Sequence, residues 1–418
     1  MTPEQTARLK RLMEYEKART EPPEGFPALP DIPGARYTDP RFFKLEQEQL
    51  LRKTWLLAAH LDELAAPGDF LCWDNAGQPV VLVHAEDGVI HAFHNICSHR
   101  GAPVVTEKTG NSARLTCRYH GWSYSLRGEL LAVRSPEDYR DLDKSCRGLK
   151  KLRCERFGKL LFVNFDTDAP SLHDWLGPIA DEWAEFRFDQ CRIASRAIFD
   201  IDCNWKIAME ANMEVYHVPS IHPKTIAPVL DFRRNVNTLY PNGHGRMIAP
   251  IPEPPDGGET RYPAWQSGWR EIDSVGEIAR TCTQSYNLFP NLVAPLNQYV
   301  LPPLLFWPAG IDRCRIETWT LAPDWGSGDG PDMWTENRGQ GLSKVLLEDT
   351  ALSEAIQASI RSQAFTGIPL SYQEARIYHW HQTADRLIGS NNIPPELRVP
   401  QAIGPDWIYP NDPRLACL

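Results

Sequence analysis

Cys97-Ser-His99 and, after seventeen intervening residues, Cys117-Arg-Tyr-His120 are the stretches that decide the fold of this chain. Each of them supplies one thiol and one imidazole. Two thiolates on one iron and two imidazoles on the other are the donors of a mixed-ligand [2Fe-2S] cluster. Replacing two thiolates by neutral imidazoles lowers the negative charge of the cluster and raises its reduction potential. We therefore expect Cys97, His99, Cys117 and His120 to hold a cluster that accepts electrons readily.

A zinc site is the main alternative, because zinc also binds two cysteines with two histidines. Zinc fingers, however, group cysteine with cysteine and histidine with histidine, whereas each half here carries one of each. Arg100-Gly101 follows the first pair and Gly121-Trp122 the second, so both loops have a glycine where the backbone approaches sulfur. With these flanks the chain resembles the Rieske non-haem iron oxygenases, whose catalytic α subunits carry the patterns CxHRG and CxxHGW.

Length and charge limit the possible functions. The 418 residues are enough for two domains, and the cluster loops occupy only part of one. The net charge of −10 argues against a general nucleic-acid binder, and no apolar run approaches the ~20 residues that cross a bilayer. The charged stretch from Met1 to Arg19 lacks the apolar core of a signal peptide. We expect a cytoplasmic protein that binds neither nucleic acid nor membrane.

The sequence lacks a motif that would bind an electron-donating cofactor. No glycine-rich fingerprint for NAD or flavin is present, because Gly326-Ser-Gly-Asp-Gly330 precedes Pro331 without a strand before it and indicates a surface loop. The eight cysteines outside the cluster motifs are scattered singly and are expected to be reduced and mostly buried. Electrons must therefore come from another protein, which the resemblance implies is a ferredoxin, a flavin reductase or both.

Three segments follow from the periodicity of apolar residues. Residues 1–49 predict a helix and a proline-rich arm that packs with the catalytic domain. Residues 50–165 have short apolar runs between Gly and Asp turns, which predicts an all-β Rieske domain. Residues 166–418 alternate helix and strand signals and resemble the family's catalytic domain, a helix-grip (START-like) fold in which a curved antiparallel sheet wraps a long helix. The expected fold class is therefore α+β.

The individual elements are predicted from the same patterns. Strands are predicted at Val80–Val83, Val89–Phe93, Leu160–Val163, Ile193–Ile201 and Arg315–Leu321. Helices are predicted at residues 1–20, Leu172–Phe186, Trp205–Val215 and Ser343–Phe365.

A second metal site is predicted downstream, since a cluster that passes one electron at a time does not oxygenate a substrate by itself. Glu214-Val-Tyr-His217-Val-Pro-Ser-Ile-His222 matches the family's acidic-x2-His-x4-His pattern, and Asn204-Trp205-Lys206 precedes it at the usual distance. If the preceding helix continues, Glu214 and His217 share one face. The bend at Pro219 then brings His222 back to the same point.

The third ligand must come from elsewhere in the chain. Two histidines and one carboxylate form a facial triad, which leaves iron positions free for O₂ and substrate chemistry. The resembling proteins supply an aspartate from a later helix, where this chain has Glu348-Asp349-Thr-Ala-Leu-Ser-Glu354. The alternative for Asp349 is a carboxylate favoured by the dipole of a helix start. The resemblance implies that His217, His222 and Asp349 hold a mononuclear Fe(II).

Glu214 departs from the commonest family pattern. Many relatives have aspartate at this position, while some that act on quaternary amines have glutamate. We expect its carboxylate to accept a hydrogen bond from the outer nitrogen of a Rieske histidine, which gives the electron a short route between the sites. In the family that histidine belongs to the neighbouring subunit, which implies a homotrimer or an α3β3 assembly.

Two further patterns are open to more than one interpretation. His379 and His381 look like a metal pair, but this spacing on a helix points them to different faces, so packing or surface roles are expected. The segment from Lys144 to Lys159 contains seven basic residues, which form either a solvated face or a docking patch for an acidic ferredoxin or reductase.

The resemblance implies the terminal component of a multicomponent oxygenase, an NAD(P)H-dependent mono- or dioxygenase that draws electrons through its partner. Apolar runs such as residues 226–232 can line a pocket, and Arg233, Arg234, Arg246 and Arg261 are candidates for gripping a carboxylate. We expect an aromatic or other hydrophobic ring substrate, carboxylic acids included, as in aromatic hydrocarbon catabolism. The alternative is hydroxylation or demethylation of a quaternary amine held by cation-π attraction. A pure electron carrier would not need the large segment after the cluster.

Overall fold

The computed structural model describes residues 1–252, 270–327 and 344–415. Within them the chain forms two compact units. The small unit is Leu51–Leu172, and the large unit combines Met1–Leu50 with His173–Leu418. None of the described helices is long and apolar enough to cross a membrane. Arg261, Ser343 and most of the predicted loop at 326–330 lie outside the described residues.

The small unit consists of two antiparallel sheets, as expected for an all-β domain. The larger sheet has the strand order β2-β11-β10-β5-β4-β3-β6, and the smaller has the order β7-β8-β9. The strands are β2 (Leu56–His60), β3 (Asp69–Trp73), β4 (Val80–His84), β5 (Ile90–His94), β6 (Thr109–Asn111), β7 (Leu115–Thr116), β8 (Ser123–Tyr124), β9 (Leu130–Ala132), β10 (Lys151–Phe157) and β11 (Leu160–Asn164). Val81, Val83 and Phe93 pack in one core with Cys97 and Cys117, so the cluster loops are rooted in the hydrophobic interior.

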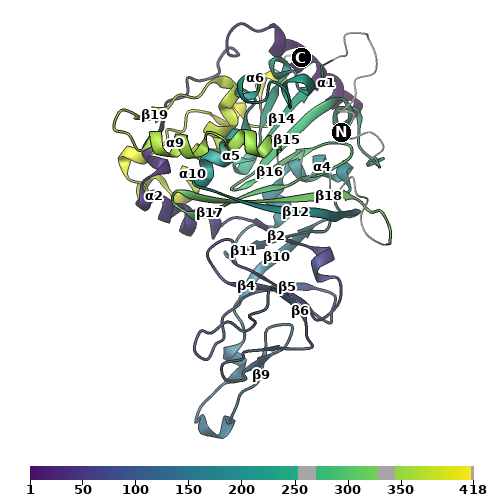
Figure 1. Ribbon diagram of the computed structural model, residues 1–418, viewed down its shortest axis with the longest axis vertical. Coiled ribbons are helices and arrows are strands. Elements are labelled where there is room, and N and C mark those ends of the chain that lie inside the picture. Colours follow the sequence, from purple (N-terminus) through teal and green to yellow (C-terminus); the bar gives the residue numbers. More distant parts are fainter. Residues whose placement is uncertain (253–269, 328–343, 416–418) are drawn as a thin grey trace. The chain divides into compact units, whose positions relative to one another are not determined.

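The large unit is organised around a second seven-stranded antiparallel sheet, with the order β12-β18-β17-β16-β15-β14-β13. Figure 1 shows this sheet curling, with α5, α9 and α10 to one side of it. The strands are β12 (Cys191–Ile201), β13 (Val236–Leu239), β14 (Gly245–Pro250), β15 (Cys282–Leu288), β16 (Leu292–Leu296), β17 (Leu304–Gly310) and β18 (Arg313–Pro323). This α+β architecture confirms the predicted fold class.

The helices of the large unit cover the sheet and its ends. They are α1 (Pro3–Ala18), α2 (Pro40–Leu45), α4 (Pro178–Trp183), α5 (Trp205–Glu210), α6 (Val218–Ile221), α7 (Glu277–Thr281), a helix at 344–350, α9 (Ser353–Ile360) and α10 (Ala375–Ile388); α3 (Leu172–Leu176) begins at the last residue of the small unit. Nearly every residue of α10 is buried, which identifies it as the central helix expected of this fold.

Three predicted helices are interrupted. Leu172–Phe186 breaks at Gly177, which has φ 53°, and the next residue is proline, which starts a new helix. Trp205–Val215 ends earlier than predicted, because one 3-10 turn follows α5 and Glu214 is extended at φ −143° and ψ 173°. The third prediction, Ser343–Phe365, is divided by a turn at 351–352. There the Thr350 hydroxyl donates to the Leu346 carbonyl at 2.7 Å, a local bond of the kind that bends helices.

The N-terminal segment belongs to the large unit. Its strand β1 (Ile32–Pro33) pairs with β19 (Gly367–Ile368). Arg36 is buried and pairs with Asp385 of α10 at 2.7 Å. The sequence placed segment boundaries after residues 49 and 165, and the compact units divide after Leu50 and Leu172.

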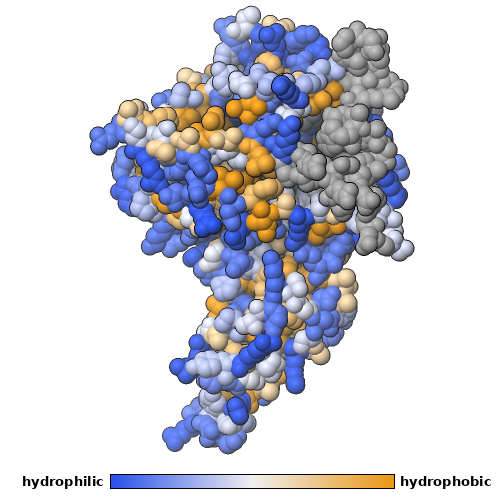
Figure 2. Space-filling model, in the orientation of Figure 1, coloured by the Kyte–Doolittle hydropathy of each residue, from blue (hydrophilic) through white to orange (hydrophobic). Residues whose placement is uncertain are grey.

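Hydrophobic side chains are also exposed on the large unit. In Figure 2 they gather over the region where Figure 1 places α5 and α9. On and beside α9, Leu352 is 52% exposed and Ile356 is 42% exposed. Contiguous exposed apolar surface of this kind commonly marks a contact with another molecule.

Candidate metal centres

Helix α5, which leads to the predicted second site, is fixed at its start by buried polar contacts. The Asn204 side chain accepts a hydrogen bond from the Lys206 backbone at 3.1 Å and so caps the helix. The Lys206 ammonium is fully buried and pairs with Glu46 of the N-terminal segment at 2.8 Å. The Asn-Trp-Lys pattern therefore has a structural role, which is to anchor the helix that precedes the histidine loop.

The loop from Glu214 to His222 reverses the chain in nine residues. One carboxylate oxygen of Glu214 accepts hydrogen bonds from the backbone N–H groups of Tyr216 and His217. Pro219 lies in the first turn of the short helix α6, where proline is tolerated. The His217 and His222 rings consequently lie 5.1 Å apart, measured between centroids. His222 therefore lies beside His217, as predicted. Glu214, however, has extended backbone and is not part of a continued helix.

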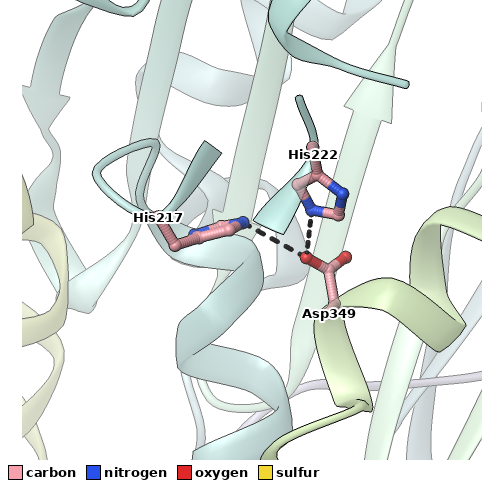
Figure 3. Close-up of side chains that lie close together, drawn as sticks. All are labelled: His217, His222 and Asp349. Carbon is pink, nitrogen blue, oxygen red and sulfur yellow. Dashed lines mark hydrogen bonds and ion pairs between the residues drawn. The ribbon is translucent and has the colours of Figure 1, made fainter. Parts of the chain in front are cut away.

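Asp349, at the end of the 344–350 helix, faces both histidines (Figure 3). One of its oxygens lies 2.7 Å from His222 Nε2 and 3.2 Å from His217 Nε2. One donor atom from each of the three residues lies within 4.8 Å of the others, and among the described residues this is the group of three that could hold one ion. The side chains of His222 and Asp349 are 2% and 6% exposed, so the point where they meet is sheltered from water.

The outer nitrogens of both imidazoles face carboxylates. His217 Nδ1 contacts Glu214, and His222 Nδ1 lies 2.8 Å from Glu348. A histidine that binds a metal through Nε2 carries its proton on Nδ1, and a carboxylate is a usual acceptor for that proton. Glu348 was not predicted as a site residue, although it lies directly beside Asp349 in the double acid Glu348-Asp349.

The electrostatics of this group favour a cation. Burial lowers the pKa of His217, but its hydrogen bonds to Asp349 and Glu214 outweigh burial and raise the pKa to about 9. His222 responds in the same direction, because contacts with Asp349 and Glu348 raise its pKa against the effect of burial. Two imidazoles and one carboxylate whose inner atoms converge on one point are the donor set of non-haem iron sites. These residues therefore fit a mononuclear Fe(II).

The two cluster loops of the small unit have matching backbones. Gly101 N–H donates to the Cys97 carbonyl at 3.0 Å, and Gly121 N–H donates to the Cys117 carbonyl at 2.9 Å. Both glycines have positive φ, 77° and 75°, and an added Cβ would meet no protein atom within 4 Å at either. Glycine is therefore required here by the left-handed backbone, whereas the sequence argument expected crowding near sulfur.

The four predicted cluster donors are arranged in two pairs. His99 Nδ1 and His120 Nδ1 lie 3.1 Å apart. The Cys97 and Cys117 side chains are in contact. Both residues belong to the core and are 3% and 1% exposed, respectively. Ligands of a single zinc ion would converge on one point. No three of these four residues form such a group. A thiol pair and a separate imidazole pair fit a cluster with two irons.

Aromatic side chains support these loops. The Tyr124 hydroxyl lies 3.2 Å from Cys97 Sγ and accepts a hydrogen bond from the Ser98 backbone at 3.0 Å. Trp122 stacks on the His99 ring at 4.9 Å between centroids. The thiols are thus inside the core, whereas His99 and His120 are only partly buried. The imidazole side of the loops is therefore the side more open to solvent.

The remaining candidates have structural partners. His379 donates to the Tyr240 carbonyl at 2.8 Å and His381 lies 2.9 Å from Glu210; both are fully buried, so of the packing and surface roles expected for them the structure shows packing. Arg246 is buried and pairs with Glu182 at 2.6 Å, which removes it from the arginines available to a substrate carboxylate.

The basic segment at 144–159 is partly engaged. Lys159 pairs with Asp62 at 3.1 Å, and Arg153 pairs with Glu155. Five other basic side chains are exposed and take part in no ion pair with the described residues: Lys144, Arg147, Lys150, Lys151 and Arg156. These five side chains leave positive charge on the surface of the small unit.

Comparisons with known proteins agree with this geometry. The family model described as Rieske [2Fe-2S] domain matches residues 54–146, and the model described as ring hydroxylating alpha subunit (catalytic domain) matches residues 184–390. One match lies in each compact unit. The chain belongs to the Rieske non-haem iron oxygenases, which carry a Rieske [2Fe-2S] cluster and a mononuclear iron.

Two curated relatives illustrate the range of the family. The oxygenase subunit of glycine betaine monooxygenase from Chromohalobacter salexigens is 33% identical over 201 residues, which are 48% of this chain and 45% of that protein. The large subunit of anthranilate 1,2-dioxygenase from Acinetobacter baylyi is 34% identical over 209 residues, 48% of this chain and 44% of that protein. The chain spans about half the length of the curated relatives it matches.

Solved structures share the fold. A quaternary ammonium Rieske monooxygenase superposes with a TM-score of 0.72 at 21% identity, over 90% of this chain and 100% of that chain. Naphthalene 1,2-dioxygenase from Rhodococcus sp. superposes with a TM-score of 0.70 at 20% identity, over 93% of this chain and 98% of that chain.

Proposed function

We propose that the chain is the terminal oxygenase component of a multicomponent Rieske oxygenase, which uses O₂ and electrons from a reductase or ferredoxin to oxidise a small organic substrate. The observation that carries the proposal is the convergence of His217, His222 and Asp349 in a sheltered position. An electron carrier or a binding module has no need of such a group. When bound, the cluster supplies electrons and the mononuclear iron supplies the oxygen chemistry.

The proposal gives each side chain a role. Cys97, His99, Cys117 and His120 bind the cluster, and His217 Nε2, His222 Nε2 and an Asp349 oxygen bind the mononuclear iron. Glu214 accepts a hydrogen bond from His217 Nδ1–H, which leaves Nε2 to bind the metal. We also assign to Glu214 a hydrogen bond from the outer nitrogen of a Rieske histidine of a neighbouring subunit, so that one carboxylate links the two sites across the assembly.

A quaternary amine is one proposed substrate class. Glycine betaine and carnitine monooxygenases are among the curated relatives, and this chain has glutamate at position 214, as some quaternary-amine oxygenases of the family do. The reaction would be hydroxylation or demethylation next to the cationic nitrogen.

A hydrophobic ring is the second proposed class. Val215 and Val218, on either side of His217, pack in an apolar cluster with Leu230, Met247 and Ala249, which provides an apolar wall beside the histidine loop. Anthranilate dioxygenase among the relatives supports this class. The engagement of Arg246 with Glu182 leaves fewer candidates for binding a ring carboxylate.

A single turnover under ¹⁸O₂ tests the function and separates the substrate classes. The protein, with both metal sites loaded, is chemically reduced and mixed with aromatic acids, polycyclic aromatics and quaternary amines, and the products are read by mass spectrometry. Two labelled oxygens on a ring establish a ring dioxygenase, whereas a demethylated amine with formaldehyde establishes the amine reaction. Cluster reoxidation without any labelled product across the panel would contradict an oxygenase and support an electron carrier.

Assembly with further copies is part of the proposal. A solved quaternary ammonium Rieske monooxygenase is described with inter-subunit electron transfer. In this chain Tyr216, next to His217, is 66% exposed, and Leu352 and Ile356 are exposed close to Asp349 in the sequence. We propose that a neighbouring subunit covers this surface in a homotrimer or an α3β3 assembly, which light scattering in solution would measure as a mass about threefold that of the protomer or larger.

A further inference from the structure

The imidazole of His222 is held on both sides by consecutive residues. Its Nε2 lies 2.7 Å from Asp349, and its Nδ1 lies 2.8 Å from Glu348. The Glu348 carboxylate also accepts a hydrogen bond from the Thr225 hydroxyl at 2.5 Å. Glu348 and Thr225, which are far apart in the sequence, thus meet beside the outer nitrogen of the ring.

The chemistry of this contact determines which group donates the hydrogen bond and which accepts it. If Nε2 binds a metal, the proton of a neutral imidazole must be on Nδ1, so Nδ1 donates and needs an acceptor. Glu348 is that acceptor, and the Thr225 hydroxyl, which donates to the same oxygen, holds the carboxylate in place. Thr225 is itself fixed, because its backbone N–H donates to the His222 carbonyl at 3.3 Å.

We propose that Glu348, oriented by Thr225, is a positioning residue that fixes the tautomer and the ring plane of His222 for metal binding. The inference rests on the proposed iron site and extends it by a second support. Glu214 supports His217 from the histidine loop, whereas Glu348 supports His222 from the helix that also provides Asp349. A ligand and the support for another ligand therefore move together on one helix.

The test measures metal affinity and leaves turnover aside. Protein with its cluster intact but its mononuclear iron removed is titrated with Fe(II) against a competing chelator. The Fe(II) dissociation constant should rise roughly 10- to 100-fold in Glu348→Ala, less in Glu348→Gln, whose amide oxygen still accepts, and less again in Thr225→Val. Glu354→Gln is the matched control, because it removes one exposed carboxylate nearby without touching His222.

A spectroscopic signature separates positioning from a merely structural role. The nitric oxide adduct of the Fe(II) protein should give an EPR signal of altered symmetry in Glu348→Gln and Thr225→Val, while the reduced cluster signal and the unfolding midpoint of the metal-free protein stay as in wild type. These two conservative variants still test the proposal if Glu348→Ala does not fold.

Two results would overturn the inference in different ways. If the Glu348 variants bind Fe(II) as wild type does while Asp349→Ala does not, Glu348 has no positioning role and the iron site stands. If Asp349→Ala also binds Fe(II) with wild-type affinity, the proposed iron site itself is wrong, and the role of Glu348 is refuted with it.

Discussion

At the scale of single residues, the histidine loop depends on which nitrogen of each imidazole is free. His217 and His222 both direct Nε2 toward Asp349 and Nδ1 toward an outer carboxylate. This arrangement makes the inner and outer carboxylates unequal, since Asp349 lies at the meeting point and Glu214 does not. Removing them should therefore have different consequences.

Replacing Asp349 by alanine should remove the mononuclear iron and spare the cluster. One of the three donors is lost, so Fe(II) affinity should fall by at least about 100-fold and product formation should cease. Iron analysis, the cluster EPR signal and product yield check this result. Retention of product would mean that another residue is the third ligand.

Replacing Glu214 by glutamine should leave both metals bound and slow electron transfer between the sites. The amide keeps the size of the side chain but loses its charge, and we expect the rate to fall roughly 10- to 100-fold. Stopped-flow reoxidation of the reduced cluster measures that rate. Loss of the mononuclear iron even at saturating Fe(II) would show that Glu214 is a ligand and more than a support for His217.

At the scale of elements, buried polar contacts tie the N-terminal segment to α5 and α10. Arg36 joins Asp385 of α10, Lys206 of α5 joins Glu46, and Tyr37 donates to Glu210 at the end of α5 at 2.7 Å. Because α5 leads directly to the histidine loop, these contacts set the position from which the loop begins. Removing these contacts should therefore lower the free energy of unfolding before it affects the reaction.

Asp385→Asn should destabilise the large unit strongly. It leaves the buried Arg36 guanidinium without its counter-charge, which typically costs about 3–5 kcal/mol. Denaturant unfolding of the metal-loaded protein measures the change. Asp312→Asn is the matched control, since Asp312 and its partner Arg361 are both about half exposed and the pair should contribute only ~0–1 kcal/mol. Equal effects from the two variants would contradict the argument.

Glu210 should make stability depend on pH. Burial raises its pKa to about 8, although the Tyr37 hydroxyl and the charges of Lys206 and Arg36 oppose the rise and Glu46 adds to it. The folded protein then holds a proton that the unfolded chain, with a carboxyl pKa near 4.5, has released. This contribution is present below about pH 4.5 and is lost as pH rises through about 8.

Glu210→Gln removes that titration. Unfolding free energies measured at several pH values between about 5 and 9 should therefore fall less with rising pH in the variant than in wild type. Identical slopes would show that Glu210 is ionised in the folded protein throughout this range.

The sequence predicted local features well and long-range ones poorly. The cluster donors and the His217–His222 loop are set by short spacings, so motif and geometry agree. The support of His222 by Glu348 is not visible in the sequence, because 126 residues separate them. The end of α5 was also missed, since it depends on the Glu214 carboxylate bonding to backbone N–H groups two and three residues later.

At the scale of the whole molecule, charge and partner contacts decide how electrons arrive. The protein is acidic overall, with a net charge of −10, yet the small unit exposes Arg147, Lys150, Lys151 and Arg156. Local positive charge on an acidic protein attracts an acidic partner to one surface only. This surface belongs to the same unit as the cluster loops.

Exchanging Arg147 and Lys150 for glutamine should slow electron uptake from an acidic ferredoxin. The reduction rate should fall roughly tenfold at low salt, and the difference from wild type should disappear at high salt, where charges are screened. The control is a double exchange of Arg11 and Lys17, exposed basic residues of α1 that carry the same charge. Equal rates for the two double variants would favour a solvated face without a docking role.

The contact of Asp349 with His222 also has a thermodynamic meaning. The two residues are 127 positions apart, so an ion bound to both closes a long loop of the chain. The unfolded chain does not hold the donors of such a loop together, so the ion binds the folded state and its binding free energy adds to stability. On the proposed assignment, the availability of iron would govern how firmly the large unit stays folded, and iron starvation would expose the chain to proteolysis before any substrate is met.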